Sequence, residues 1–193
     1  MKSIAIFCGS NDGALSAYRE HAIALGHELA NRGITLIYGG ASVGLMGAVA
    51  DAVLEKGGNV IGILPHFLQT REIAHKHLTE LIVVDSMHER KAKMAEMSDG
   101  FIVLPGGPGT MEEYFEIFTW AQLGLHEKPC GLMNIEHYYD PLVALFNQMA
   151  NQRFMQQKYR EMVIVDTTPE GILDQFAHYK HPSVKTYLTE DRT

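Results

Sequence analysis

The segment FIVLPGGPGT, residues 101–110, decides the fold of this chain. An apolar run ends at Pro105, three glycines follow within five residues, and an apolar, aromatic stretch with helical spacing begins at Thr110. This order predicts a strand, a glycine turn and a helix. Glycines allow a close approach of the backbone, and a helix start offers unpaired N–H groups with a partial positive charge. The segment therefore predicts an anion site that suits a phosphate, although it matches neither the P-loop nor the G-x-G-x-x-G pattern.

The same alternation of elements extends outward from this segment along the chain. Short apolar runs predict strands at residues 4–8, 35–38, 59–64, 81–84, 101–104, 129–133 and 162–165. Helical patterns cover residues 16–32, 48–56, a stretch that begins at 85–86, a stretch from 110, residues 141–150 and residues 169–179. Apolar runs that do not alternate with polar residues are typical of parallel strands covered on both faces. We expect an α/β fold, a Rossmann-like doubly wound parallel sheet in a single domain over residues 1–193, with the tail after about residue 180 peripheral.

Ligands of such folds bind beyond the carboxyl ends of the strands. The glycine turn at residues 106–109, the loop that contains Ser10 and the helix start at residues 87–91 all fall at that edge. A second glycine loop, GGASVGLMG at residues 39–47, falls there too. Its glycines fit ligand contact and tight helix–strand packing equally well. The predicted binding edge therefore has one motif that suits a phosphate and one ambiguous motif.

Composition narrows the class of partner. The net charge is −7 and the basic residues are scattered, which disfavours nucleic acid and anionic membranes as partners. The apolar run at the N-terminus is too short for a signal peptide, and no apolar stretch is long enough to cross a bilayer. Cys8 and Cys130 lack metal-site spacing and fit reduced core residues, so a cytoplasmic protein is expected.

Two histidines raise the question of a metal site. His75 and His77 form a His-x-His pair within residues 65–77, a segment with no clean period that we predict to be a loop. The pair lacks a third ligand at a recognisable spacing. We therefore favour a solvated loop over a metal centre and expect no bound metal.

Arg90 carries the second clue to function. It lies four and seven residues before Met94 and Met97, so it shares their inward-facing stripe on a helix whose start, Ser86 to Glu89, fits a capping box. The helix dipole disfavours a cation near this end by a few tenths to about 1 kcal/mol. Either Arg90 pairs with a nearby acid such as Glu89 or Asp85, or it faces a ligand phosphate or a catalytic carboxylate.

Glu113 admits two roles. Thr110 and Glu113 satisfy the capping-box spacing, in which the glutamate only caps the helix. However, Glu112, Glu113 and Glu116 crowd one helix start, and their mutual repulsion suggests that one of them faces a substrate. A carboxylate beside a bound sugar phosphate, opposite an arginine, suits cleavage at an anomeric carbon through an oxocarbenium-like transition state. No G-x-S-x-G elbow or zinc motif offers a rival chemistry.

These residues carry a resemblance to a known family. The chain closely resembles the Lonely Guy (LOG) family of cytokinin riboside 5'-monophosphate phosphoribohydrolases, whose motif P-G-G-x-G-T-x-x-E stands here at residues 105–113. The likeness covers nearly all of the chain up to about Tyr159. It includes FCGS from Phe7, YGGASVGLMG from Tyr38, PHFLQTREI from Pro65, MHERK from Met87, TWAQLGLHEKP from Thr119 and NIEHYYDPL from Asn134.

The resemblance implies hydrolysis of the N-glycosidic bond of adenosine-type nucleotides, AMP or cytokinin riboside 5'-monophosphates, to free base and ribose 5-phosphate. It implies no cofactor, and a homodimer with the active site near the subunit interface. Arg90 and Glu113 match the catalytic pair, and residues 107–110 match the phosphate loop. The substrate contacts that we predict are Ser10, Gly44, Glu72, Met87, Lys91, Gly107, Pro108, Gly109, Thr110, Met111, Glu112 and Thr119.

Two other functions remain as alternatives. The same pocket would serve a non-catalytic nucleotide sensor, which binds AMP and releases no product. Amino-acid decarboxylation is a label that the family has carried, but it needs pyridoxal phosphate on a lysine, and Lys91 is the only lysine beside the motifs. Pro108 departs from the tyrosine common in relatives and removes one N–H donor from the phosphate loop.

Overall fold

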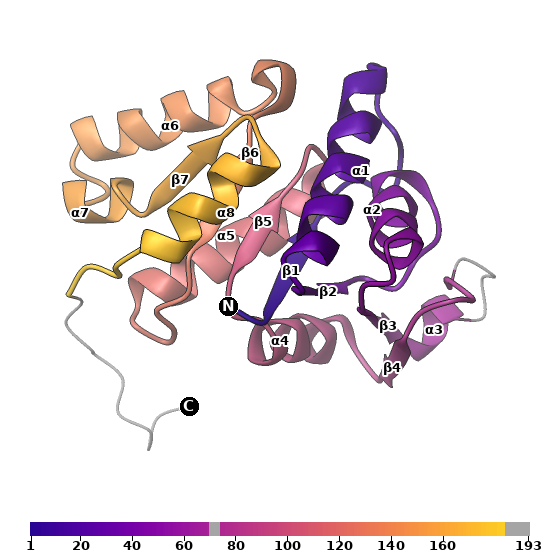
Figure 1. The fold of residues 1–193 in the computed structure, drawn as a ribbon. Helices are drawn as coiled ribbons and strands as arrows, with labels where there is room; N and C mark the ends of the chain where they lie inside the picture. Colours follow the sequence, from indigo (N-terminus) through magenta and orange to yellow (C-terminus); the bar gives the residue numbers. More distant parts are fainter. Residues whose placement is uncertain (70–73, 184–193) are drawn as a thin grey trace.

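A seven-stranded parallel sheet forms the centre of the molecule in the computed structural model, which describes residues 1–69 and 74–183. Its strands are β1 (Ser3–Phe7), β2 (Thr35–Tyr38), β3 (Val60–Pro65), β4 (Glu80–Val84), β5 (Phe101–Val103), β6 (Cys130–Met133) and β7 (Val163–Asp166). They lie in the order β4-β3-β2-β1-β5-β6-β7 (Figure 1). Since the chain winds outward from β1 in both directions, the expected doubly wound α/β fold is confirmed.

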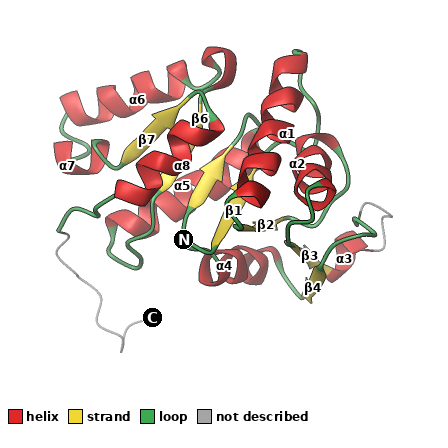
Figure 2. Cartoon of the chain, in the orientation of Figure 1, coloured by secondary structure: helices red, strands yellow, loops and turns green. Residues whose placement is uncertain are grey.

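Helices cover both faces of the sheet (Figure 2). They are α1 (Ser16–Asn31), α2 (Gly44–Glu55), α3 (His66–Gln69), α4 (Met87–Met97), α5 (Pro108–Gln122), the 3-10 turn η1 (Ile135–His137), α6 (Asp140–Asn151), α7 (Gln157–Arg160) and α8 (Pro169–His178). Strand β1 shows how the two layers arise: Ile4 and Ile6 pack with α1, α2 and α8, while Ala5 and Phe7 pack with α4, α5 and α6. Successive side chains of a strand point to opposite faces, so an unbroken apolar strand serves two cores.

The sheet reverses its winding between β1 and β5, which pair with Phe7 opposite Val103. The loops that follow these two strands therefore leave the same edge side by side. The N–H of Gly9 donates to the carbonyl of Pro105 at 3.0 Å and joins the two loops. In open α/β sheets this reversal point leaves the crevice in which ligands bind.

Two helices begin earlier than the sequence pattern predicts. Helix α2 begins at Gly44 and not at residue 48, and α5 begins at Pro108 and not at Thr110. Pro108 occupies the first turn, where its fixed φ suits the helix and its missing N–H costs nothing. Gly44 and Gly109, which indicated loops, thus lie in the first turns of helices.

The segment at residues 65–77, predicted to be a loop, contains regular secondary structure at its start. Pro65 ends β3, and residues 66–69 form the short helix α3, while Glu72 lies outside the described residues. His75 is buried, not solvated: its ring Nε2 lies 2.9 Å from Oδ1 of Asp51, and its backbone N–H donates to the carbonyl of Gly40. Residues 1–69 and 74–183 contain no group of three side chains arranged to hold a metal ion.

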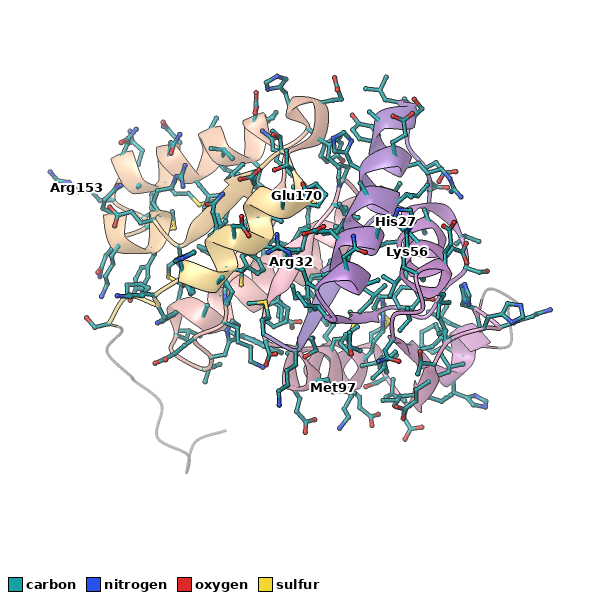
Figure 3. The ribbon with its side chains drawn as sticks, in the orientation of Figure 1. His27, Arg32, Lys56, Met97, Arg153 and Glu170 are labelled. Carbon is teal, nitrogen blue, oxygen red and sulfur yellow. The ribbon has the colours of Figure 1, made fainter. Side chains whose placement is uncertain are left out.

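Surface contacts tie the first helix to the last. Arg32, which follows α1, donates to Glu28 at 2.6 Å and to Asp174 of α8 at 2.7 Å (Figure 3). Its side chain keeps 31% of its surface exposed, so solvent screens both ion pairs. None of the helices in the described part of the chain has the length and apolar character needed to cross a membrane.

Candidate active site

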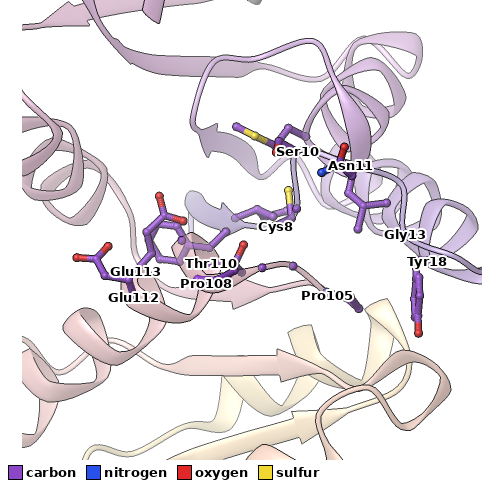
Figure 4. A pocket seen from close by; sticks show the side chains of 18 of the residues that line it. Cys8, Ser10, Asn11, Gly13, Tyr18, Pro105, Pro108, Thr110, Glu112 and Glu113 are labelled. Atoms are coloured by element: carbon purple, nitrogen blue, oxygen red, sulfur yellow. The ribbon is translucent and has the colours of Figure 1, made fainter.

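A pocket of about 540 Å³ opens at the carboxyl ends of β1 and β5, where the winding of the sheet reverses. It is lined by residues 6–13 and 105–110, by side chains of α1, α2, α4 and α5, and by Tyr138, which follows η1. Glu112 and Glu113 stand at one end and Tyr18 at the other, with Cys8 between them (Figure 4). The site therefore combines an acidic end with the glycine loop that the sequence marks as an anion site.

The glycines at residues 106–109 differ in the space around them. A Cβ on Gly106 would lie 2.2 Å from Oγ1 of Thr110 and 2.8 Å from the backbone nitrogen of Gly9, so close packing requires that glycine. A Cβ on Gly107 or Gly109 would meet nothing within 4 Å. Since neither has a positive φ, packing and backbone conformation leave both positions free for larger residues. Their smallness instead leaves room for a ligand to reach the backbone.

Unpaired backbone donors face this room. The first turn of α5 lacks intrahelical partners for its N–H groups, and no side chain caps it. Pro108 has no N–H to offer, but Gly107, Gly109 and Thr110 keep theirs. These donors and the helix dipole suit a phosphate.

Arg90 and Glu113 form a buried ion pair beside the loop. Nη2 of Arg90 lies 3.4 Å from Oε1 of Glu113, and each side chain is 10% exposed. Gly39 lets the guanidinium lie here, because a Cβ on Gly39 would lie 2.1 Å from Nη2. Glu89 instead accepts from the N–H of Asp85 and its own N–H donates to Ser86. Pairing of Arg90 with a local acid is therefore wrong; its partner comes from another helix.

Glu113 is a deeply placed carboxyl group rather than a helix cap. Helix α5 has Gly107 as its N-cap, so Thr110 lies inside the first turn and the capping-box interpretation of Glu113 is wrong. Burial raises the pKa of Glu113 and Arg90 lowers it, with a net shift above the ordinary value. A buried carboxylate with a raised pKa is a common feature of catalytic acids and bases.

Lys91 accounts for the other two glutamates of the helix start. Its Nζ lies 2.5 Å from Glu112 and 2.9 Å from Glu116, and its side chain is 5% exposed. Burial lowers the pKa of Lys91, but the hydrogen bonds that its ammonium group donates to the two glutamates raise it by more, and the net shift is upward. Lys91 thus pairs with both Glu112 and Glu116, and Glu113 pairs with Arg90. Within the described residues, the buried Nε of Arg90 has no hydrogen-bond acceptor.

Comparison with known proteins reveals close relatives. The family model described as "Possible lysine decarboxylase" matches residues 46–176. The chain is 48% identical to the probable cytokinin riboside 5'-monophosphate phosphoribohydrolase LOGL1 of Oryza sativa subsp. japonica, over 91% of this chain and 79% of that protein. It is 43% identical to the cytokinin riboside 5'-monophosphate phosphoribohydrolase LOG3 of Arabidopsis thaliana, over 97% of this chain and 88% of that protein. This chain belongs to the LOG family.

A solved structure confirms the fold alone. The molybdenum cofactor binding protein from Rippkaea orientalis superposes with a TM-score of 0.70 over 92% of this chain and 96% of that one, at 22% identity. At this identity the likeness extends to the doubly wound sheet and carries no statement about ligands. Evidence on function comes from the LOG relatives, whose names are those of N-glycosyl hydrolases.

The pocket of this LOG protein gathers most of the predicted site residues. Those that line it are Ser10, Met87, Arg90, Gly107, Pro108, Gly109, Thr110, Glu112 and Glu113. Four predicted contacts, Gly44, Lys91, Met111 and Thr119, do not line it. Glu72 lies outside the described residues. The roles of all these residues remain predictions.

The second glycine loop serves packing. A Cβ on Gly44 would lie 2.3 Å from the carbonyl carbon of Ser10, and one on Gly47 would lie 2.2 Å from the carbonyl oxygen of Ser42. Neither glycine lines the pocket, whereas Leu45 and Met46 between them do. Gly44 therefore packs against the backbone of Ser10, which lines the pocket.

Sequence reasoning missed Tyr138, whose hydroxyl donates to the carbonyl of Gly106 at 2.6 Å. The residue follows the η1 turn and lines the pocket with Tyr18, and the two rings meet edge to face with centroids 5.8 Å apart. It stands in the NIEHYYDPL stretch, which resembles the family but has no periodic or glycine signal. The backbone conformation of η1 places Tyr138 beside Gly106.

Proposed function

We propose that this LOG protein hydrolyses the N-glycosidic bond of adenosine-type nucleoside 5'-monophosphates, cytokinin riboside 5'-monophosphates or AMP, and releases free base and ribose 5-phosphate. The observation that carries the proposal is the Arg90–Glu113 pair, buried at one end of a pocket whose floor is a phosphate-type loop. The names of the LOG relatives support the same reaction.

The phosphate and the sugar of the substrate bind in different parts of the pocket in this proposal. The 5'-phosphate binds to the N–H groups of Gly107, Gly109 and Thr110 at the start of α5. Glu113 lies one helical turn after Thr110, so a sugar held by its phosphate has its anomeric carbon near that carboxylate. The loop thereby positions the scissile bond against the catalytic pair.

The chemical step uses water and needs no further reactant. The bond from C1' to the base nitrogen breaks, and its electron pair leaves with the base. The oxygen of water bonds to C1', Glu113 accepts the proton that this water gives up, and the departing base takes up a proton from solvent, so one water is consumed in all. The negative charge of Glu113 stabilises the oxocarbenium-like transition state, and Arg90, which lowers the pKa of this buried carboxyl, favours its ionised form.

The two alternatives are less well supported. A non-catalytic sensor is disfavoured by the hydrolase names of relatives that align over nearly the whole chain. Decarboxylation on Lys91 conflicts with the geometry, because that lysine does not line the pocket. It is also charged and bound to two glutamates, and its raised pKa makes it a poor nucleophile.

We further propose a cytoplasmic homodimer formed by this single-domain chain. The family resemblance supports the dimer, and exposed apolar side chains, among them Val83 on the edge strand β4, suit a protein contact. The buried free thiols of Cys8 and Cys130 fit a reducing compartment. Sedimentation of the purified protein tests the dimer, and a monomer at micromolar concentration would contradict it.

The reaction is tested by incubating the protein with AMP and with isopentenyladenosine 5'-monophosphate. Chromatography of the products should show adenine or isopentenyladenine together with ribose 5-phosphate. Relative kcat/KM values then assign the preferred base. If AMP binds in calorimetry while neither nucleotide releases a base, the sensor replaces the hydrolase.

A further inference from the structure

Three consecutive carbonyl groups of the phosphate loop are each held by a donor. The carbonyl of Leu104 accepts from the hydroxyl of Tyr139 at 2.6 Å, and that of Pro105 accepts from the N–H of Gly9 at 3.0 Å. The carbonyl of Gly106 accepts from the hydroxyl of Tyr138 at 2.6 Å. Two adjacent tyrosines from the turn after β6 thus hold both ends of the bend.

Holding a carbonyl also sets the direction of the next N–H. A trans peptide is planar, and its C=O and N–H point in opposite directions. The described part of the chain contains no cis peptide, so the bond of Gly106 to Tyr138 turns the N–H of Gly107 away from that tyrosine. No hydrogen bond within the described residues uses this N–H. It remains free for a ligand.

Within the described residues, the bond from Tyr138 is the one hydrogen bond that the Gly106–Gly107 peptide group makes. A Cβ on Gly107 would meet no atom within 4 Å, so side-chain packing does not restrain the residue. Glycine has the widest choice of backbone conformations, and the peptide between two glycines rotates easily. The hydroxyl of Tyr138 is therefore the contact that selects one orientation.

The turn before Tyr138 is built to place this residue. Glu136 and His137 both have positive φ, 49° and 60°, which non-glycine residues rarely adopt. Asn134 stabilises the turn: its Oδ1 accepts from the N–H of Tyr139, and its Nδ2 donates to Asp140, both at 2.7 Å. Backbone strain that is held by several contacts is a frequent feature of functional sites. Tyr138 nevertheless stays 40% exposed, so it is not a core residue.

We propose that Tyr138 is a positioning residue that aims the Gly107 N–H at the phosphate of the substrate. Tyr138 acts through the Gly106 carbonyl and does not itself take part in bond breaking. The inference rests on the proposed function for the identity of the substrate. Its core, the recognition of a phosphate by an oriented N–H, is testable without turnover.

The test is Tyr138→Phe, which removes one oxygen and keeps the ring against Tyr18. Calorimetry with ribose 5-phosphate should show binding about three- to tenfold weaker, the range for loss of one hydrogen bond. The KM for AMP should rise by a similar factor with kcat little changed, because phosphate contacts act equally in ground and transition states. Adenosine, which lacks the phosphate, should bind the variant and the wild type equally.

A spectroscopic readout separates positioning from stability. The amide proton of Gly107 should shift strongly downfield when ribose 5-phosphate is added to the wild type, and much less in Tyr138→Phe. The control is Tyr159→Phe, the same chemical change on α7 outside the pocket, which should leave both measurements unaltered. Equal ribose 5-phosphate affinity in Tyr138→Phe and wild type overturns the inference, as does a lower melting temperature with an unchanged Gly107 shift. If no base is released but the affinity difference is found, the proposed function fails and the positioning role stands.

Discussion

Removal of the guanidinium in Arg90→Met leaves the Glu113 carboxylate buried without its partner. At 3.4 Å and an effective dielectric constant of about 20, the attraction between the two charges is about 5 kcal/mol. Each side chain is only 10% exposed, so solvent replaces little of it. Breaking a buried pair typically costs about 3–5 kcal/mol, and we expect a loss of this size at pH 8.

The loss should depend on pH in a definite direction. Burial already raises the pKa of Glu113, and removal of Arg90, which lowers it, raises that pKa further. A carboxyl with a higher pKa in the folded than in the unfolded protein takes up protons on folding, so stability falls as the pH rises through the folded-state pKa. As the pH falls, the buried group takes up a proton and loses its charge. The deficit of Arg90→Met should therefore shrink between pH 8 and pH 5.

Urea unfolding at both pH values measures this effect. The double variant Arg90→Met/Glu113→Gln has no buried charge and should recover most of the stability lost at pH 8. The control Arg32→Met removes an arginine from two exposed ion pairs and should cost less than about 1 kcal/mol. A deficit of Arg90→Met that is equal at both pH values and is not recovered in the double variant would refute the buried-pair reasoning.

Three further predictions concern the surroundings of the pair. Gly44→Ala places a Cβ 2.3 Å from Ser10 at a φ of 57°, so it should cost well over 1 kcal/mol of stability in thermal melts and should lower kcat/KM. The control Gly33→Ala, at a φ of 67° but with open space around the Cβ, should cost only about 1 kcal/mol in the same melts. Lys91→Met removes a cation that lowers the pKa of Glu113, so the acidic limb of the kcat/KM profile should move to higher pH, and an unmoved limb would contradict the coupling. Burial lowers the pKa of His126 to about 4, so stability should fall as the pH falls from 6.5 to 4, and His126→Phe should flatten that dependence in urea titrations.

The sequence indicates the position of the site because parallel sheets bind at their carboxyl edge. Unalternating runs such as residues 101–104 predict buried parallel strands, and the glycines that follow predict backbone exposure at that edge. Arg90 was also predictable, because its spacing to Met94 and Met97 places a charge on a buried stripe. In these cases the hydrophobic period or the residue type itself determines where the residue lies in the fold.

Other features of the site depend on contacts that no local pattern encodes. Thr110 and Glu113 fit a capping box, but Pro108 begins the helix one turn earlier, as its fixed φ favours. Gly39 and Gly44 resemble a ligand loop, yet they are small because Arg90 and Ser10 press against them from other segments. Tyr138 reaches the loop through a turn with two positive φ values at non-glycine residues, which sequence gives no reason to expect.

The role of Glu113 as the catalytic carboxylate is tested most directly by the turnover of Glu113→Gln on AMP. This change removes the charge and keeps the shape, so kcat should fall by about 100- to 10,000-fold, the range for a lost general base. Calorimetry should show ribose 5-phosphate affinity within about twofold of wild type, because the loop at residues 107–110 is untouched. A Glu113→Gln variant that binds ribose 5-phosphate and still releases adenine at the wild-type rate would contradict the account.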